Sequence, residues 1–224
     1  VRVDHVRDGR LNRGARFHSG VELTGIVHLL ADMDGAEVVG DHVTVRLPDG
    51  SRVHAIAAGL AHRGHGPWIS IRRFRRSGLD AAALIQAGAI PSAAWDWLST
   101  ALVEGRMNVV VAGPVGSGKT TLAELLLREV SPDERVLILQ DVEEIVPPCA
   151  GSAWGSFRPG PGGYEALLAS MLRMQPDRLA VGEVRGPEAW VMLDALVTGH
   201  PGGITTVHAH SAVGALRRLE TLCL

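Results

Sequence analysis

The sequence predicts an α/β fold with a mainly parallel sheet, preceded by a small α+β module. From Met107 onward, short continuous apolar runs alternate with segments of helical periodicity, which is typical of parallel strands joined by helices. Before that point, short alternating stretches are separated by turn residues, which is typical of antiparallel strands. We therefore predict an N-terminal domain over residues 1–78 and a second domain over residues 79–224, with the boundary near residues 76–80.

The composition restricts the class of protein. An apolar fraction of 46% with 21% charged residues is ordinary for a soluble globular protein, and a net charge of −2 argues against nucleic-acid binding driven by bulk electrostatics. No apolar stretch approaches the ~20 residues that span a bilayer. Cys149 and Cys223 cannot form a disulfide framework, so a reducing compartment is expected. The first residue, Val1, is neither an initiator methionine nor part of a signal peptide, and we expect the chain to begin mid-protein.

The N-terminal module is predicted from local patterns. Residues 1–18 predict two strands joined by a turn. Residues 19–22, Ser-Gly-Val-Glu, match a capping box and predict a helix that ends near Gly35. Residues 43–56 alternate on either side of a Pro-Asp-Gly turn and predict a hairpin, and residues 68–74 predict a further strand.

A basic cluster ends this module and consists of Arg72, Arg73, Arg75 and Arg76. One interpretation is a solvated strand end. The other is a set of cations that face a phosphate or a neighbouring subunit.

The second domain is organised around a glycine-rich loop that fits the P-loop pattern. Its residues are Gly113, Pro114, Val115, Gly116, Ser117, Gly118, Lys119 and Thr120. An apolar run over residues 107–112 predicts a buried strand before it, and residues 121–130 predict an amphipathic helix after it. This order forms a phosphate cradle, in which Lys119 reaches the terminal phosphates and the Thr120 hydroxyl holds Mg²⁺. Lys119 is the only lysine in the chain, against 21 arginines.

The other elements of this domain follow from apolar runs and breakers. Helices are predicted over residues 79–87, 91–104, 164–174 and 187–196. Strands are predicted over residues 136–139, 179–181 and 204–207. Residues 148–163 are rich in glycine and proline and predict a long loop.

Polar residues follow each predicted strand, and open α/β sheets bind ligands beyond the carboxyl ends of their strands. Asp141 and Glu144 follow the second strand, Glu183 the third and His208 the fourth. The carboxylates could bind Mg²⁺ through water and orient or deprotonate an attacking water, and the histidine could sense the γ-phosphate. Each residue alone is an ordinary strand terminus, but together with the P-loop they predict a nucleotide-hydrolysis site.

Other residues of chemical interest receive structural interpretations. We expect Trp154, Trp190 and Cys149 to be packing residues. His54, His62 and His65 lie too far from any Cys/His pair at metal-ligand spacing, so no zinc site is predicted there.

Four blocks in this order resemble the secretion ATPases of the type II/type IV superfamily (GspE/PilT-like), in particular the CpaF type that powers Tad pilus assembly. The blocks are Gly113–Thr121 (Walker A), Gln140–Glu144 (Asp box), Leu172–Ala189 (Walker B) and Thr198–Ser211 (His box). Two upstream stretches, Leu47–Val53 and Ser70–Phe74, also look like that family's N-terminal domain.

The resemblance implies a RecA-like P-loop NTPase domain that binds ATP and Mg²⁺ through residues 113–121, with Thr120 and Glu183 at the metal. It implies a homo-hexameric ring on the cytoplasmic side of the inner membrane, bound to a platform protein, with membrane contact only through partners and no nucleic acid. In the family, arginines of the N-terminal domain and of the Asp-box region approach the nucleotide. The candidates here are Arg52, Arg72, Arg73 and Arg158.

The chain departs from the family's pattern in several places. Gln140 stands where glutamate is usual, His210 where asparagine is usual, and Pro201 where aspartate is common. The general base is therefore open between Asp141 and Glu144. Because family members are longer at both ends, we expect a shortened chain whose C-terminal domain is incomplete.

Two functions follow from these observations. The first is ATP hydrolysis that powers pilus assembly or type II/IV secretion in a ring-shaped motor. The alternative is a nucleotide-binding structural subunit of a secretion platform without hydrolytic activity, which Gln140 and the short chain motivate. A DNA-handling motor is less well supported, because no basic aromatic stripe is present.

Overall fold

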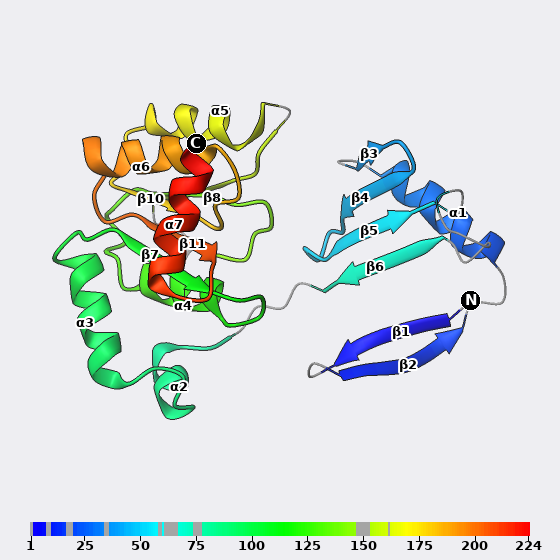
Figure 1. Ribbon diagram of the computed structural model, residues 1–224, viewed down its shortest axis with the longest axis horizontal. Coiled ribbons are helices and arrows are strands. Elements are labelled where there is room, and N and C mark those ends of the chain that lie inside the picture. Colours follow the sequence, from blue (N-terminus) through cyan, green and yellow to red (C-terminus); the bar gives the residue numbers. More distant parts are fainter. Residues whose placement is uncertain are drawn as a thin grey trace. The chain divides into compact units, whose positions relative to one another are not determined.

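The structure is a computed structural model that describes residues 2–7, 10–16, 20–33, 36–57, 60, 67–73, 78–146, 153–160 and 162–224. The chain forms two compact units, Val1–Arg75 and Arg76–Leu224, which Figure 1 shows in blue to cyan and in green to red. Arg75, Arg76, His62, His65 and Cys149, together with the predicted N-cap Ser19, lie outside the described residues.

The N-terminal unit contains a hairpin, a helix and an antiparallel sheet. The hairpin pairs β1 (Arg2–Arg7) with β2 (Arg10–Arg16), and the helix is α1 (Gly20–Ala31). The sheet runs in the order β3 (Glu37–Val39), β4 (His42–Arg46), β5 (Arg52–Ile56) and β6 (Trp68–Arg72). The predicted hairpins, helix and last strand are confirmed, whereas β3, of three residues, was not predicted from the sequence.

The core of this unit lies between α1 and one face of the sheet. Val43, Val45 and Val53 alternate with polar residues along β4 and β5 and are almost fully buried. The turn between these strands is closed by Asp49, whose carboxylate accepts hydrogen bonds from the backbone N–H and the hydroxyl of Ser51, both at 2.9 Å. These bonds, the backbone one first, lower the pKa of Asp49.

The C-terminal unit is built on a five-stranded sheet in which all strands are parallel. Their order is β7 (Val109–Gly113), β11 (Ile204–His208), β10 (Arg178–Val181), β8 (Val136–Leu139) and β9 (Trp154–Phe157). The helices are α2 (Ala81–Gln86), α3 (Ser92–Val103), α4 (Lys119–Arg128), α5 (Gly163–Leu172), α6 (Glu188–Thr198) and α7 (Ala212–Cys223). The predicted α/β class with a parallel sheet is confirmed.

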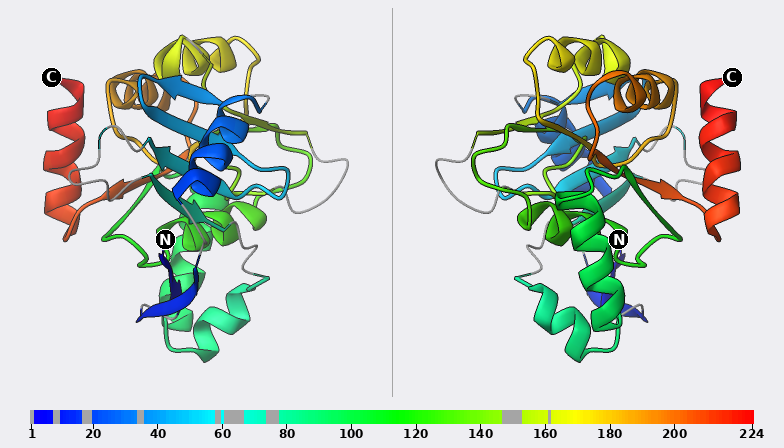
Figure 2. Two further views of the ribbon diagram at one scale, coloured as in Figure 1. Left: turned by 90° about the vertical axis from the view of Figure 1, so that its right-hand side faces the viewer. Right: turned by 90° about the vertical axis from the view of Figure 1, so that its left-hand side faces the viewer.

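Helices cover both faces of this sheet because its strands are apolar on both sides. On one face, Ile138 and Ala180 pack with residues of α3 and α4. On the other, Leu139 and Val181 pack with residues of α5, α6 and α7. Figure 2 shows α5 (yellow) beside α6 (orange), with α7 (red) following β11. No helix among the described residues is both long and apolar enough to cross a bilayer.

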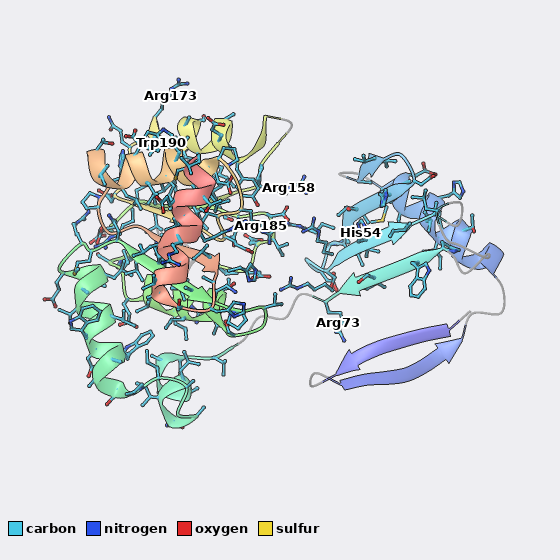
Figure 3. The ribbon with its side chains drawn as sticks, in the orientation of Figure 1. His54, Arg73, Arg158, Arg173, Arg185 and Trp190 are labelled. Carbon is cyan, nitrogen blue, oxygen red and sulfur yellow. The ribbon has the colours of Figure 1, made fainter. Side chains whose placement is uncertain are left out.

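Two structural predictions for this unit were wrong. The predicted loop over residues 148–163 contains β9, which pairs with β8 through registers such as Leu137 with Gly155. Trp190 is not a packing residue, since 61% of its surface is exposed on α6 (Figure 3). Trp154, by contrast, packs against the core cluster beneath α3 and α4, as predicted.

Candidate active site

All five strands of the parallel sheet end at the same edge, and each end carries a residue of chemical interest. Following the strand order β7, β11, β10, β8 and β9, these residues are Gly113, His208, Glu183, Asp141 and Arg158. The sequence predicted polar residues at the ends of the strands. The strand order adds that the P-loop is next to the His208 strand end, which in turn is next to that of Glu183.

The P-loop is shaped by its glycines. Gly116 and Gly118 have positive φ angles of 74° and 85°, which favour glycine. A side chain at Gly113 would collide with the Ser117 hydroxyl, so the loop can fold tightly only with glycine there. Gly118 is the N-cap of α4 and supplies no side-chain cap, so the first N–H groups of α4 have no such acceptor. This arrangement fits an anion at the start of α4.

Lys119 lies at the centre of the site with only 8% of its surface exposed. Its ammonium donates to the carbonyl oxygen of Pro114 at 2.9 Å and contacts Nδ1 of His208 at 3.3 Å. An ammonium has only donors, so Nδ1 must accept. Nε2, on the other side of the ring, faces the carboxylate of Glu183 and can donate to it.

Glu183 continues this chain of contacts on the far side of His208. Its Oε1 lies 2.9 Å from Nε2 of His208, and its Oε2 accepts from Arg185 at 2.7 Å. Lys119, His208, Glu183 and Arg185 thus form one continuous polar chain, which we call the site chain. It links the P-loop to the ends of the two neighbouring strands.

The segment after β10 is fixed by residues that the sequence analysis did not single out. The N–H groups of Arg185 and Gly186 both donate to Oε1 of Glu188, at 2.6 and 2.9 Å. Glu188 is 4% exposed in the first turn of α6, where a carboxylate also complements the helix dipole. Its position, a few residues after the strand and at a helix start, was the signal that could have identified it.

Tyr164, at the start of α5, is a second residue that the sequence analysis did not assign to the site. Burial, reinforced by the negative charge of Asp141, raises the pKa of Tyr164 to about 12. Arg185 acts in the opposite direction, and Glu188 and Glu183 add to the increase. The charges of Asp141, Glu183 and Arg185 therefore all influence the phenol of Tyr164.

The Asp box is shaped by Gln140, which is 4% exposed. Its side-chain amide donates to the carbonyl of Ile145 at 2.8 Å and to the hydroxyl of Ser156 at 2.9 Å. Its carbonyl oxygen accepts from the N–H groups of Glu144 and Ile145, at 3.1 and 2.9 Å. Gln140 therefore holds the loop that carries Asp141 and Glu144, and its replacement of an acidic residue has a structural reason.

The candidate arginines occupy different units. Arg72 and Arg73 lie at the exposed end of β6 in the N-terminal unit, where Arg52 pairs with Arg72 in the sheet register. Arg158 is exposed and follows β9 in the C-terminal unit (Figure 3). The roles of these arginines at a nucleotide remain predictions.

The geometry agrees with comparisons to known proteins. Residues 19–224 match the family described as Type II/IV secretion system protein. The chain belongs to this family. It is 45% identical over 141 residues to the conjugal transfer protein TrbB of Rhizobium radiobacter, a match that covers 61% of this chain and 40% of that relative. The chain thus spans less than half the length of TrbB.

Solved structures of this secretion family share the fold. The VirB11 ATPase from the Brucella suis type IV secretion system, in complex with sulphate, matches with a TM-score of 0.54 and 25% identity, over 99% of this chain and 72% of that one. The ATPase DotB of Legionella pneumophila matches with a TM-score of 0.64 and 23% identity, over 96% of this chain and 61% of that one. The RecA-like class predicted for the second domain is confirmed by this likeness.

The residues of this secretion-family site fit a magnesium nucleotide. Sites of this kind hold Mg²⁺ by one or two protein oxygens together with phosphates and water. The Thr120 hydroxyl in the first turn of α4 and the carboxylates of Glu183 and Asp141 are donors of that class. Among the described residues no cluster of three His, Cys, Asp or Glu could hold a metal ion by itself.

Proposed function

We propose that this chain binds and hydrolyses MgATP and that the hydrolysis powers type IV secretion or pilus assembly in a ring-shaped motor. The observation that carries this proposal is the site chain, in which the single lysine of the protein contacts the histidine and, through it, the glutamate of two neighbouring strand ends. A P-loop that served only to bind a nucleotide would not need these two groups beside its lysine.

The residues of the site would act by exchanging partners. Lys119 leaves the Pro114 carbonyl and His208 for phosphate oxygens, because an ammonium interacts more strongly with an anion than with a carbonyl or a neutral imidazole. His208 then has Nδ1 free and lies beside the terminal phosphate. Glu183 and Asp141 hold and orient the attacking water from the neighbouring strand ends. When bound, Mg²⁺ would neutralise charge on the phosphates.

Two substitutions test this proposal. Lys119→Ala should abolish nucleotide binding, because it removes the only lysine of the cradle. Glu183→Gln should retain binding and stop phosphate release, since removing such a group costs several orders of magnitude in related chemistry. Binding is measured by thermal shift, where nucleotide at ~100 times its Kd should add ~2.7 kcal/mol of stability. Turnover by Glu183→Gln at the parent rate would remove Glu183 from the mechanism.

The same pair of measurements separates the alternative function. A nucleotide-binding structural subunit would show the thermal shift without phosphate release in the parent chain. The structure weakens one motive for that alternative, because Gln140 shapes the Asp box through four hydrogen bonds and leaves Asp141 and Glu144 as its carboxylates. We propose Asp141 as the second carboxylate of the reaction, because it closely follows β8, the strand next to that of Glu183, and Glu144 is the alternative.

The assembly and its location are part of the proposal. We place the chain in a homo-hexamer at the cytoplasmic face of the inner membrane, bound to a platform protein of the secretion system. The two units would act as an N-terminal α+β domain and a RecA-like domain, as the sequence predicts. Support comes from the family and from relatives named for conjugal transfer and type IV secretion. Size-exclusion chromatography with and without ATP tests ring formation, and specificity for Tad pili remains the finer prediction.

A further inference from the structure

The carboxylate of Glu183 has two oxygens with separate partners. Oε1 contacts Nε2 of His208 at 2.9 Å, and Oε2 accepts from a guanidinium nitrogen of Arg185 at 2.7 Å. The side chain of Glu183 is 19% exposed, whereas that of Arg185 is 57% exposed. An ion pair this open to solvent contributes little to folding, so stability alone does not account for it.

The backbone is shaped so that Arg185 reaches Glu183. The residue between them, Val184, is buried in the core and donates its N–H to the carbonyl of Thr206 on β11 at 3.1 Å. Val184 enters the core, whereas the side chains of Glu183 and Arg185 on either side of it contact each other at 2.7 Å in the site. Glu188 then fixes the backbone of Arg185 and Gly186 by accepting both N–H groups.

The site stabilises the positive charge that the guanidinium of Arg185 carries at any ordinary pH. The hydrogen bond to Glu183 is the largest cause that raises the pKa of Arg185, and the negative charges of Glu183 and Asp141 act in the same direction. Arg185 therefore stays cationic whichever partner Oε1 of Glu183 takes. Figure 3 shows its side chain within the C-terminal unit, and Arg173 pointing outward from the same unit.

We propose that Arg185 is a positioning residue for hydrolysis: it anchors Oε2 of Glu183 so that Oε1 alone can exchange His208 for the attacking water or a magnesium-bound water. This inference rests on the proposed ATPase function. Without Arg185, the carboxylate can rotate about its terminal bond and present either oxygen, which lowers the fraction of molecules with a productive geometry. Binding of ATP at the P-loop in the absence of Mg²⁺ should depend little on Arg185.

Kinetics of the 224-residue chain with MgATP test the proposal. Arg185→Gln should lower kcat by about 10- to 100-fold, the range for groups that orient a functional side chain, and should change KM for MgATP much less than kcat. Arg185→Lys should recover part of the loss, because an ammonium can hold one carboxylate oxygen but lacks the planar fork. The matched control is Arg217→Gln, an exposed arginine on α7 outside the four sequence blocks, which should behave like the parent.

A second readout needs no turnover. ATP affinity is measured with and without Mg²⁺ in the parent, Arg185→Gln, Glu183→Gln and the double variant. The gain in affinity from Mg²⁺ should fall in Arg185→Gln and be equally low in Glu183→Gln and the double variant, because Arg185 acts only through Glu183. Thermal unfolding of each variant confirms that it folds.

The outcomes separate this inference from the proposed function. If the parent neither binds nor hydrolyses ATP, the proposed function fails and the role of Arg185 fails with it. If the parent is active and Arg185→Gln matches Arg217→Gln, only the positioning role is wrong. If Arg185→Gln raises KM without lowering kcat, Arg185 binds the nucleotide directly and the positioning role is again overturned. If the parent binds ATP without hydrolysing it, the gain in affinity from Mg²⁺ tests the positioning role. A gain in Arg185→Gln equal to that of the parent would overturn it.

Discussion

The parallel sheet has an amino edge, where its strands begin, and a carboxyl edge, where they end. The two edges carry the same kinds of charged side chain but use them in opposite ways. At the amino edge, Arg178 begins β10 and is fully buried. It donates to Glu134 at 2.8 and 3.1 Å, to the carbonyl of Val103 at 2.9 Å, and to the carbonyl of Leu102. Arg106 also binds Glu134, at 2.7 Å. At the carboxyl edge, the members of the site chain are joined end to end, and all except the buried Lys119 remain partly open to solvent.

The difference shows which charges hold the fold and which are available for chemistry. Arg178 donates to the last carbonyls of α3 and to a carboxylate, so it has no donor left for a ligand. Breaking these bonds would lower the stability of the fold. Each bond of the site chain can be exchanged for one to a phosphate or to water. The cluster around Arg178 differs from the candidate active site in that the hydrogen-bond donors of its central, fully buried arginine are all used, rather than in the kinds of charge it contains.

The largest effect on stability is expected at the amino edge. Arg178→Met should lower the free energy of unfolding by about 3–5 kcal/mol, because it leaves Glu134 and the α3 carbonyls without their buried partner. Urea denaturation measures the loss, with Arg173→Met as the exposed control. A loss no greater than that of the control would show that the two edges do not differ as described. Adding Glu134→Leu to Arg178→Met should recover part of the loss.

An intermediate effect is expected at Gln140, which belongs to the carboxyl edge but is buried like Arg178. Gln140→Glu removes the donor to Ile145 and Ser156 and should cost about 1–3 kcal/mol. Urea denaturation again gives the value. An unchanged unfolding free energy, with phosphate release faster than in the parent, would mean that this position is catalytic rather than structural.

A smaller effect, confined to alkaline solution, is expected at Tyr164. Its folded pKa of about 12 lies above the ordinary value of 10, so between these values the unfolded chain has lost a proton that the folded chain keeps. Stability from this group is complete below pH 10 and is lost as the pH rises toward 12. Tyr164 is the only tyrosine, so tyrosinate absorbance reports it alone. Tyr164→Phe should lose this absorbance change and flatten the alkaline decline, and an ordinary titration in the parent would contradict the buried, acidic surroundings.

The smallest effect on stability is expected within the site chain. His208→Asn should change the unfolding free energy by less than about 0.5 kcal/mol, because the imidazole is 44% exposed and its contacts are individually weak. ATP hydrolysis should nevertheless fall, which single-turnover phosphate release would detect. Destabilisation comparable to that of Arg178→Met would place His208 among the structural charges.

The sequence predicted the elements of the C-terminal unit because their signals are local. Continuous apolar runs identified β7, β8, β10 and β11, and the glycine loop identified the start of α4. β9 was missed since its four residues include Gly155 and lie among glycines and prolines. Its strand conformation depends on pairing with β8, which local sequence does not encode.

The site could be predicted only as a set of strand ends. Which end lies next to which depends on strand order, and that order placed His208 between Lys119 and Glu183. Arg185 was missed because, in the sequence, an arginine two residues after Glu183 resembles a solvated surface residue. The structure shows that Val184 between them is buried and that the side chains of Glu183 and Arg185 contact each other. Trp190 was misassigned because a tryptophan on an amphipathic helix is usually a core residue.

The isolation of Lys119 has a practical consequence. Its Nζ is the only side-chain primary amine in the 224 residues, and it lies between the Pro114 carbonyl and His208. An amine-selective reagent followed by mass spectrometry would thus report on a single atom inside the phosphate cradle, without any introduced label. Nucleotide occupancy could be read from how strongly it shields that nitrogen.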